Sequence, residues 1–125
     1  MKMEKLQAAR SDSLLEALAS SGITRHIAFK AENCQVLRSR SAPGVISGWH
    51  HHGDYDVYGY VVSGSGRFES GHGTEDAIIV SAGDFFHVPP HTIHREINPS
   101  RDEGNEFILF LHGSGQMVYN LENSE

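Results

Sequence analysis

The stretch Gly44–Gly66, GVISGWHHHGDYDVYGYVVSGSG, places three consecutive histidines between two segments rich in β-branched and aromatic residues. Both flanking segments have the composition of strands. Successive side chains of a strand point to opposite faces, so His50 and His52 share one face and His51 takes the other. Two imidazoles ~6–7 Å apart along one strand can converge on a metal ion. Two histidines on a solvated strand face fit the same pattern, so this stretch alone leaves the metal site open.

A second stretch, Gly83–Asn98, reads GDFFHVPPHTIHREIN and adds a further histidine on a strand. Phe85–Val88 has strand composition, Pro89 and Pro90 form a turn, and the strand that follows carries His94. The chain thus offers a third imidazole from a different strand.

Together the two stretches resemble the paired signatures of the cupin family. The first family pattern is a glycine, five residues, His-x-His, three or four residues, a glutamate, six residues and a glycine, and its matches here are Gly44, His50, His52 and Gly64. The second is a glycine, five residues, Pro-x-Gly, two residues, a histidine, three residues and an asparagine, matched by Gly83, Pro89, His94 and Asn98. The resemblance covers residues 44–98, and it implies a metal site made by His50, His52 and His94.

Two positions depart from the family pattern. Val57 stands where most cupins have a metal-binding glutamate, and His91 replaces the glycine of the second pattern. Three neutral imidazoles leave the charge of a dication uncompensated, so we expect an anionic ligand at the metal. Asp54 and Asp56 are the nearby carboxylates that could substitute for the glutamate. Turn chemistry favours another role for Asp54, and Asp56 has the opposite strand parity to Val57.

Residues 1–125 are expected to form one all-β domain, which the resemblance makes a cupin double-stranded β-helix, or jelly-roll barrel. Short apolar segments at turn spacing predict nine to eleven strands from Ile23 onward. The most apolar of them, Glu106–Leu111, is expected at the centre of a sheet. Residues 1–22 are expected to form a helical arm, with one short helix around Ser13–Ser20.

Composition narrows the possible partners. The chain has 125 residues, 38% of them hydrophobic, and a formal net charge of −6. This acidic balance disfavours nucleic acid, which requires a basic surface, and no apolar run is long enough for a membrane span. The N-terminal segment lacks a signal-peptide core and Cys34 is the only cysteine, so a cytoplasmic location is expected. The apolar arm and the family resemblance predict a homodimer.

The resemblance to three-histidine cupins favours a non-haem Fe(II) dioxygenase with one divalent metal per subunit and a small, anionic substrate. Zinc, nickel or manganese would instead indicate an isomerase, cyclase or lyase, and a non-enzymatic small-molecule-binding protein is a further alternative. Candidate catalytic residues are His91 and Tyr60. Val57, Gly59 and Val61, which the family pattern places on the metal side of their strand, are expected to line the pocket.

Overall fold

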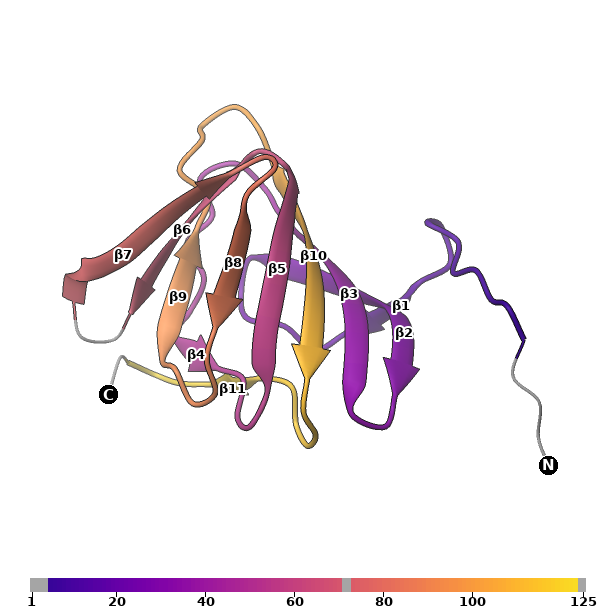
Figure 1. Ribbon diagram of the computed structural model, residues 1–125. Coiled ribbons are helices and arrows are strands. Elements are labelled where there is room, and N and C mark those ends of the chain that lie inside the picture. The colour runs from indigo at the N-terminus through magenta and orange to yellow at the C-terminus, as the bar shows by residue number, and fades with distance from the viewer. Residues whose placement is uncertain (1–4, 71–72, 124–125) are drawn as a thin grey trace.

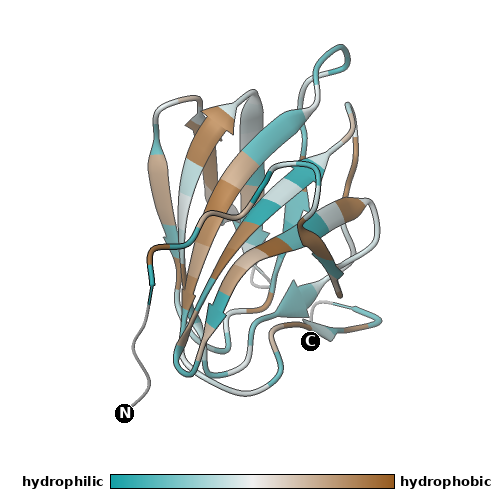
Figure 2. Ribbon diagram, turned by 90° about the vertical axis from the view of Figure 1, so that its right-hand side faces the viewer, coloured by the Kyte–Doolittle hydropathy of each residue, from teal (hydrophilic) through white to brown (hydrophobic). Residues whose placement is uncertain are grey.

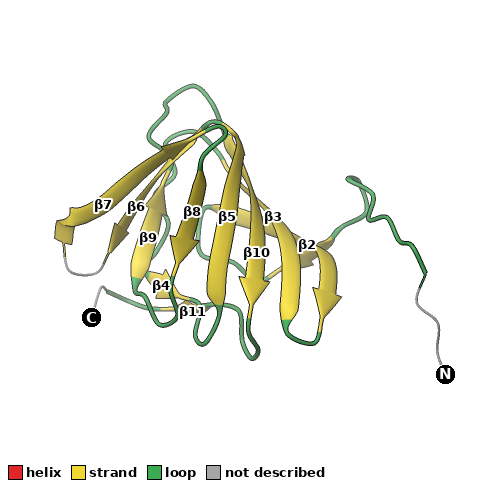
Figure 3. Ribbon diagram, in the orientation of Figure 1, coloured by secondary structure: helices red, strands yellow, loops and turns green. Residues whose placement is uncertain are grey.

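The computed structural model describes residues 5–70 and 73–123, and this part of the chain folds into eleven strands with no helix (Figure 3). The strands form two antiparallel sheets that face each other (Figure 1). The expected all-β architecture is therefore confirmed. Among the described residues, no helix is long and apolar enough to cross a membrane.

The first sheet has six strands in the order β1-β2-β3-β10-β5-β8. β10 lies in its interior between β3 and β5, as the apolar composition of this segment predicts. The strands are β1 (Leu15–Ala17), β2 (Ile23–Ala31), β3 (Cys34–Ser41), β5 (Asp56–Ser63), β8 (Phe85–Val88) and β10 (Asn105–His112).

The second sheet has five strands in the order β11-β4-β9-β6-β7. β4 and the start of β9 lie at the lower end of the molecule in Figure 1, and the loop that follows β9 lies at the opposite end. The strands are β4 (His50–His51), β6 (Ser65–Ser70), β7 (Gly73–Ser81), β9 (His94–Ile97) and β11 (Tyr119–Asn120).

The hydrophobic core fills the space between the two sheets. On β10, Phe107, Leu109 and Leu111 are buried while the intervening Ile108 and Phe110 are exposed. This alternation is the two-residue period of a strand with one face toward a core. Hydrophobic segments run along the strands of the sheets in Figure 2. The buried apolar side chains that contact one another come from both sheets: Leu37, Tyr55, Val57, Val61, Phe68, Val80, Phe86, Val88, Phe107, Leu109 and Leu111.

The helix expected around Ser13–Ser20 is wrong. Residues Leu15–Ala17 form β1, which pairs antiparallel with β2 through Leu15↔Ile27 and Ala17↔Arg25. A helix of about eight residues has little intrinsic stability in water, whereas pairing with an existing sheet edge satisfies the backbone groups of this segment. Leucine and alanine content therefore misled the prediction. The first four residues of the expected arm lie outside the described part of the chain.

Candidate metal centre

The fold brings His50, His52 and His94 together in the interior at the lower end of the barrel. His50 lies on β4 directly opposite His94, the first residue of β9, and His52 follows β4 on the same face as His50. The ring centroids of His50 and His94 are 4.3 Å apart, and His52 lies 5.1 Å from each of them. All three side chains are buried, with exposed fractions of 0%, 2% and 3%.

Each of the three rings is held at Nδ1 by a backbone carbonyl. A carbonyl only accepts, so Nδ1 carries the proton and donates it, and Nε2 is left with a free lone pair. This is the arrangement in which metal-ligating histidines are commonly held. The three bonds are His50 Nδ1 to Gly48 O at 2.9 Å, His52 Nδ1 to Met117 O at 2.9 Å and His94 Nδ1 to Thr92 O at 2.8 Å.

The free nitrogens have the environment of metal ligands. Nε2 of His50 and of His94 is buried and has no hydrogen-bond partner among the described residues. One ligand atom from each of the three histidines lies within 4.8 Å of the other two. Ligand atoms of a tetrahedral metal with ~2.0–2.1 Å bonds are ~3.4 Å apart, so small side-chain movements would complete a coordination sphere. The residues present therefore fit a divalent metal.

Electrostatics keeps the three histidines neutral. Burial, followed by the charges of His94 and Arg25, lowers the pKa of His50 to about 3. Burial is also the main cause that lowers the pKa of His52 and of His94, and the Arg25 charge adds to it in both cases. Neutral imidazole is the form that binds a metal, so no proton must leave these rings at neutral pH.

No carboxylate belongs to this cluster among the described residues. Asp54 accepts a 2.7 Å hydrogen bond from Nε2 of His91 on the surface, and Asp56 pairs with Nε2 of His87 at the same distance. The two aspartates considered as substitutes for the family glutamate thus have other partners. Val57, at the glutamate position, is a buried member of the hydrophobic core.

The structure does not bring the two candidate catalytic residues to the three imidazoles. Tyr60 is partly exposed on the outer face of β5, where its ring lies 4.8 Å from that of Phe85. His91 is exposed in the turn before β9 and has a left-handed φ of 57°. That conformation explains why glycine suits this position in the family pattern, since a side chain there is strained.

The three residues expected to line the pocket, Val57, Gly59 and Val61, all face the interior from β5. The space beside Gly59 is filled by the ring of Phe86, with which a Cβ at position 59 would collide. This part of the interior is therefore packed with apolar side chains.

A cavity of about 190 Å³ lies beside His94, on the side where β6 and β7 approach β8. Phe68, Val88 and Pro89 form apolar walls, and His87 and Asp76 also line it. A small organic molecule in this cavity would lie against the His94 ring.

Arg25 is a buried charge that the sequence motifs did not indicate. Arg25 on β2 is only 3% exposed, and its nearest acidic partner is Glu96, with Nη2 and Oε2 3.8 Å apart. Burial lowers the pKa of Arg25, and the Glu96 charge partly opposes this effect. Arg25 shares strand parity with the partly buried Ile27, which is the signal that places it inside.

Comparison with protein families identifies the same family that the sequence motifs resemble. Residues 37–111, more than half of the chain, match the sequence profile of the Cupin domain family. A comparison with curated protein sequences finds no significant match.

Solved structures share the fold at low sequence identity. KdgF from Halomonas sp. superposes with a TM-score of 0.70 and 22% identity, over 89% of this chain and 96% of that one. Pac13, described as a nucleoside dehydratase, gives a TM-score of 0.74 and 17% identity over 97% and 95% of the two chains. The polyketide cyclase RemF from Streptomyces resistomycificus gives 0.73 and 14% over 99% and 89%.

Proposed function

This chain belongs to the cupin family, and from that premise we propose that it is a metal-dependent enzyme acting on a small, anionic organic molecule. The observation that carries the proposal is the cluster of three buried histidines, each held at Nδ1 by a backbone carbonyl. A set of three neutral donors suits a divalent cation and leaves its charge available for an anionic ligand.

Each group of residues in the site has its own role in the proposed reaction. His50, His52 and His94 would hold the metal, which when bound supplies Lewis acidity and open positions for an anionic oxygen or sulfur. The carbonyls of Gly48 and Thr92 keep two of these rings in one orientation and tautomer. The apolar walls beside His94 exclude water and so strengthen electrostatic attraction to the substrate.

The reaction we favour is oxidation by dioxygen at Fe(II). A centre of three imidazoles without a carboxylate is the feature that resembles cupin dioxygenases, and the absence of an acid from the described cluster supports it.

A lyase, dehydratase or cyclase with zinc, nickel or manganese is the second candidate. Two proteins with the same fold support it, since Pac13 is described as a nucleoside dehydratase and RemF as a polyketide cyclase. In that case the metal would act only as a Lewis acid, and no dioxygen would be consumed.

Metal analysis of protein purified without chelators or nickel resin tests the proposal. We expect one divalent metal per chain, and iron that gives an electron paramagnetic resonance signal with nitric oxide favours the dioxygenase. Tightly bound zinc favours the second candidate. Protein that takes up no divalent metal contradicts both.

His94→Ala tests the ligand set. It should lose most of the bound metal, because two imidazoles hold a divalent ion far more weakly than three. The exposed His112→Ala is the matched control and should keep the metal content of the wild type. Circular dichroism should show the same strand content in both variants, and equal metal content in the two would contradict the assignment.

We further propose that the protein is a cytoplasmic homodimer. The free thiol of Cys34 agrees with a reducing compartment. Several large apolar side chains on the outer face of the six-stranded sheet support self-association.

A further inference from the structure

The guanidinium of Arg25 has far fewer partners than a buried cation needs. An arginine offers five N–H donors, and a buried charge is stable only when it is paired and hydrogen-bonded. Among the described residues, Nε of Arg25 has no partner, and the ion pair with Glu96 is 3.8 Å long, beyond hydrogen-bonding distance. The interior therefore holds a positive group with unused donors.

Arg25 lies close to the three histidines. Glu96, against which the guanidinium lies, is two residues after His94 on the same strand, β9. Two residues along a strand correspond to ~6–7 Å and return to the same face. The unused donors of Arg25 thus lie beside the residue that is one strand repeat along from a proposed metal ligand, and the Arg25 charge lowers the pKa of all three histidines.

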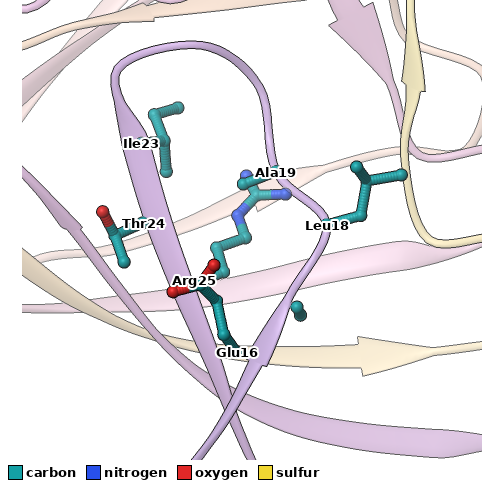
Figure 4. Close-up of a pocket in the computed structure, with 7 residues that line it drawn as sticks. Glu16, Leu18, Ala19, Ile23, Thr24 and Arg25 are labelled. Carbon is teal, nitrogen blue, oxygen red and sulfur yellow. The ribbon is translucent and has the colours of Figure 1, made fainter.

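Arg25 is also open to a second hollow. The loop that joins β1 to β2 covers a space of about 450 Å³ lined by Glu16–Ala19 and Ile23–Arg25. Figure 4 shows the Arg25 side chain extending beneath this loop, with its guanidinium beside Ala19. The hollow gives a small molecule a place beside the guanidinium.

We propose that Arg25 is the oxyanion-binding residue of the substrate site, holding a carboxylate or phosphate of a molecule whose other end binds the metal. This inference rests on the proposed metal-dependent function and narrows its substrate to one with two anionic groups. A guanidinium binds either oxyanion with two parallel hydrogen bonds, which would occupy donors that now have no partner. A divalent metal, Arg25 and Glu96 together leave two positive charges, which a dianion balances.

Ligand binding to the full chain reconstituted with Zn²⁺, a metal without redox chemistry, tests the inference by calorimetry. Acetate carries one anionic group, succinate carries two carboxylates, and phosphoglycolate carries a carboxylate and a phosphate. Succinate and phosphoglycolate are called dianions here for their two anionic groups, although the phosphate group itself carries a charge of about −1.5 to −2. Wild type should bind at least one of the two dianions at least tenfold more tightly than acetate. Arg25→Met should weaken that binding at least tenfold and change acetate binding less than threefold. The dianion that loses more affinity identifies the group held by Arg25.

A structural role for Arg25 predicts a different result. If Arg25 only bridged the two sheets through Glu96, Arg25→Met would lower the melting temperature and leave the preference for dianions unchanged. The preference for dianions, and not the melting temperature, separates the two roles, because Arg25→Met leaves the Glu96 carboxylate without its partner in either case. Arg40→Met, which removes an exposed arginine paired with Glu106, is the matched control and should leave all three affinities unchanged.

Two further measurements make the outcome decisive. Arg25→Lys keeps the charge but loses the paired donors, so its affinity for the preferred dianion should fall between those of wild type and Arg25→Met. Zinc content is measured in the same samples. Wild-type protein that takes up no zinc contradicts the metal centre. If wild type and Arg25→Met both hold zinc and bind the dianions equally well, only the present inference is contradicted.

Discussion

At the scale of single residues, the three histidines combine burial with a fixed tautomer. Their Nδ1 atoms are satisfied by backbone carbonyls, while Nε2 of both His50 and His94 is buried without a partner among the described residues. An unpaired buried acceptor costs ~1–3 kcal/mol. The molecule thus retains a locally unfavourable arrangement that a bound cation would relieve.

The same burial predicts that the metal-free protein loses stability in acid. The folded-state pKa of each histidine is lowered, to about 3 for His50, while the unfolded-state value is ~6.5. Below pH 6.5 the unfolded chain therefore binds more protons, and His50, with its pKa lowered to about 3, removes up to ~1.4 kcal/mol of unfolding free energy per pH unit. The stabilisation is complete above pH 6.5 and is lost as the pH falls toward the folded-state values.

Urea denaturation of the metal-free protein at pH 7.5, 6.0 and 5.0 checks this prediction. The difference in slope between wild type and His50→Gln isolates the contribution of one histidine, because the other titrating groups are common to both. The slope should decrease by up to ~1.4 kcal/mol per pH unit in the variant, since the pKa of His50 is lowered to about 3. Identical slopes would show that His50 is not held neutral.

At the scale of elements, β5 presents two buried valines to the interior, four residues apart. Val57 stands at the glutamate position of the family pattern, and Val61 lies ~13 Å further along the same face. Both belong to the hydrophobic core. A carboxylate at either position would be buried among apolar groups, at a cost on the order of 3–5 kcal/mol if left unpaired.

Val57→Glu and Val61→Glu therefore form a matched pair. Both should lower the melting temperature of the metal-free protein. Added Zn²⁺ should restore much of the lost stability only in Val57→Glu, because a carboxylate there would reach the metal. Thermal melts with and without zinc measure this difference. Equal rescue of both variants, or of neither, would show that position 57 does not face the metal.

Leu15–Ala17 forms a strand although its composition favours a helix, because β2 offers unpaired backbone groups at the sheet edge. Ser20 and Asn120 reinforce this edge, since the Ser20 hydroxyl donates to Asn120 Oδ1 at 2.8 Å. A contact between residues so far apart in sequence cannot be inferred from local propensity.

At the scale of the whole molecule, one outer face is conspicuously apolar. Register pairs Phe110 with Tyr58 and Ile108 with Tyr60, and Phe85 lies next to Tyr60. All five side chains are exposed. The second sheet differs because it carries a charged cluster, in which Arg67 and Arg95 both donate hydrogen bonds to Glu69. These hydrogen bonds lower the pKa of Glu69. A second copy packed on the apolar face by two-fold symmetry would cover it on both chains.

Light scattering after gel filtration tests this arrangement. Wild type should have twice the 13.8 kDa mass of the chain. Ile108→Lys should shift the protein toward monomer by raising the dimer dissociation constant at least tenfold, because an interfacial lysine must be desolvated. Ile79→Lys changes a more exposed isoleucine of the other sheet and should leave the mass unchanged. A monomeric wild type at all concentrations would contradict the proposal.

The sequence alone was sufficient for the features that depend on short-range periodicity. Alternation along β5 and β10 separates buried from exposed side chains, and the spacing within Gly44–Gly66 and Gly83–Asn98 indicates the cupin fold and the three clustered histidines. A strand has a strict two-residue period, so a few residues determine which side chains share a face.

Only the tertiary structure decided what those faces meet. It made a strand of the expected helix, left Tyr60 outside and His91 on the surface, filled the space at Gly59 with Phe86, and brought Arg25 against Glu96. Each of these outcomes depends on which strand lies beside or across from another. The separation in sequence is 8 positions for the pair Ala17↔Arg25 and 71 positions for the pair Arg25–Glu96. Their energies come from hydrogen bonds and packing that exist only once the two sheets have met, so no local pattern can encode them.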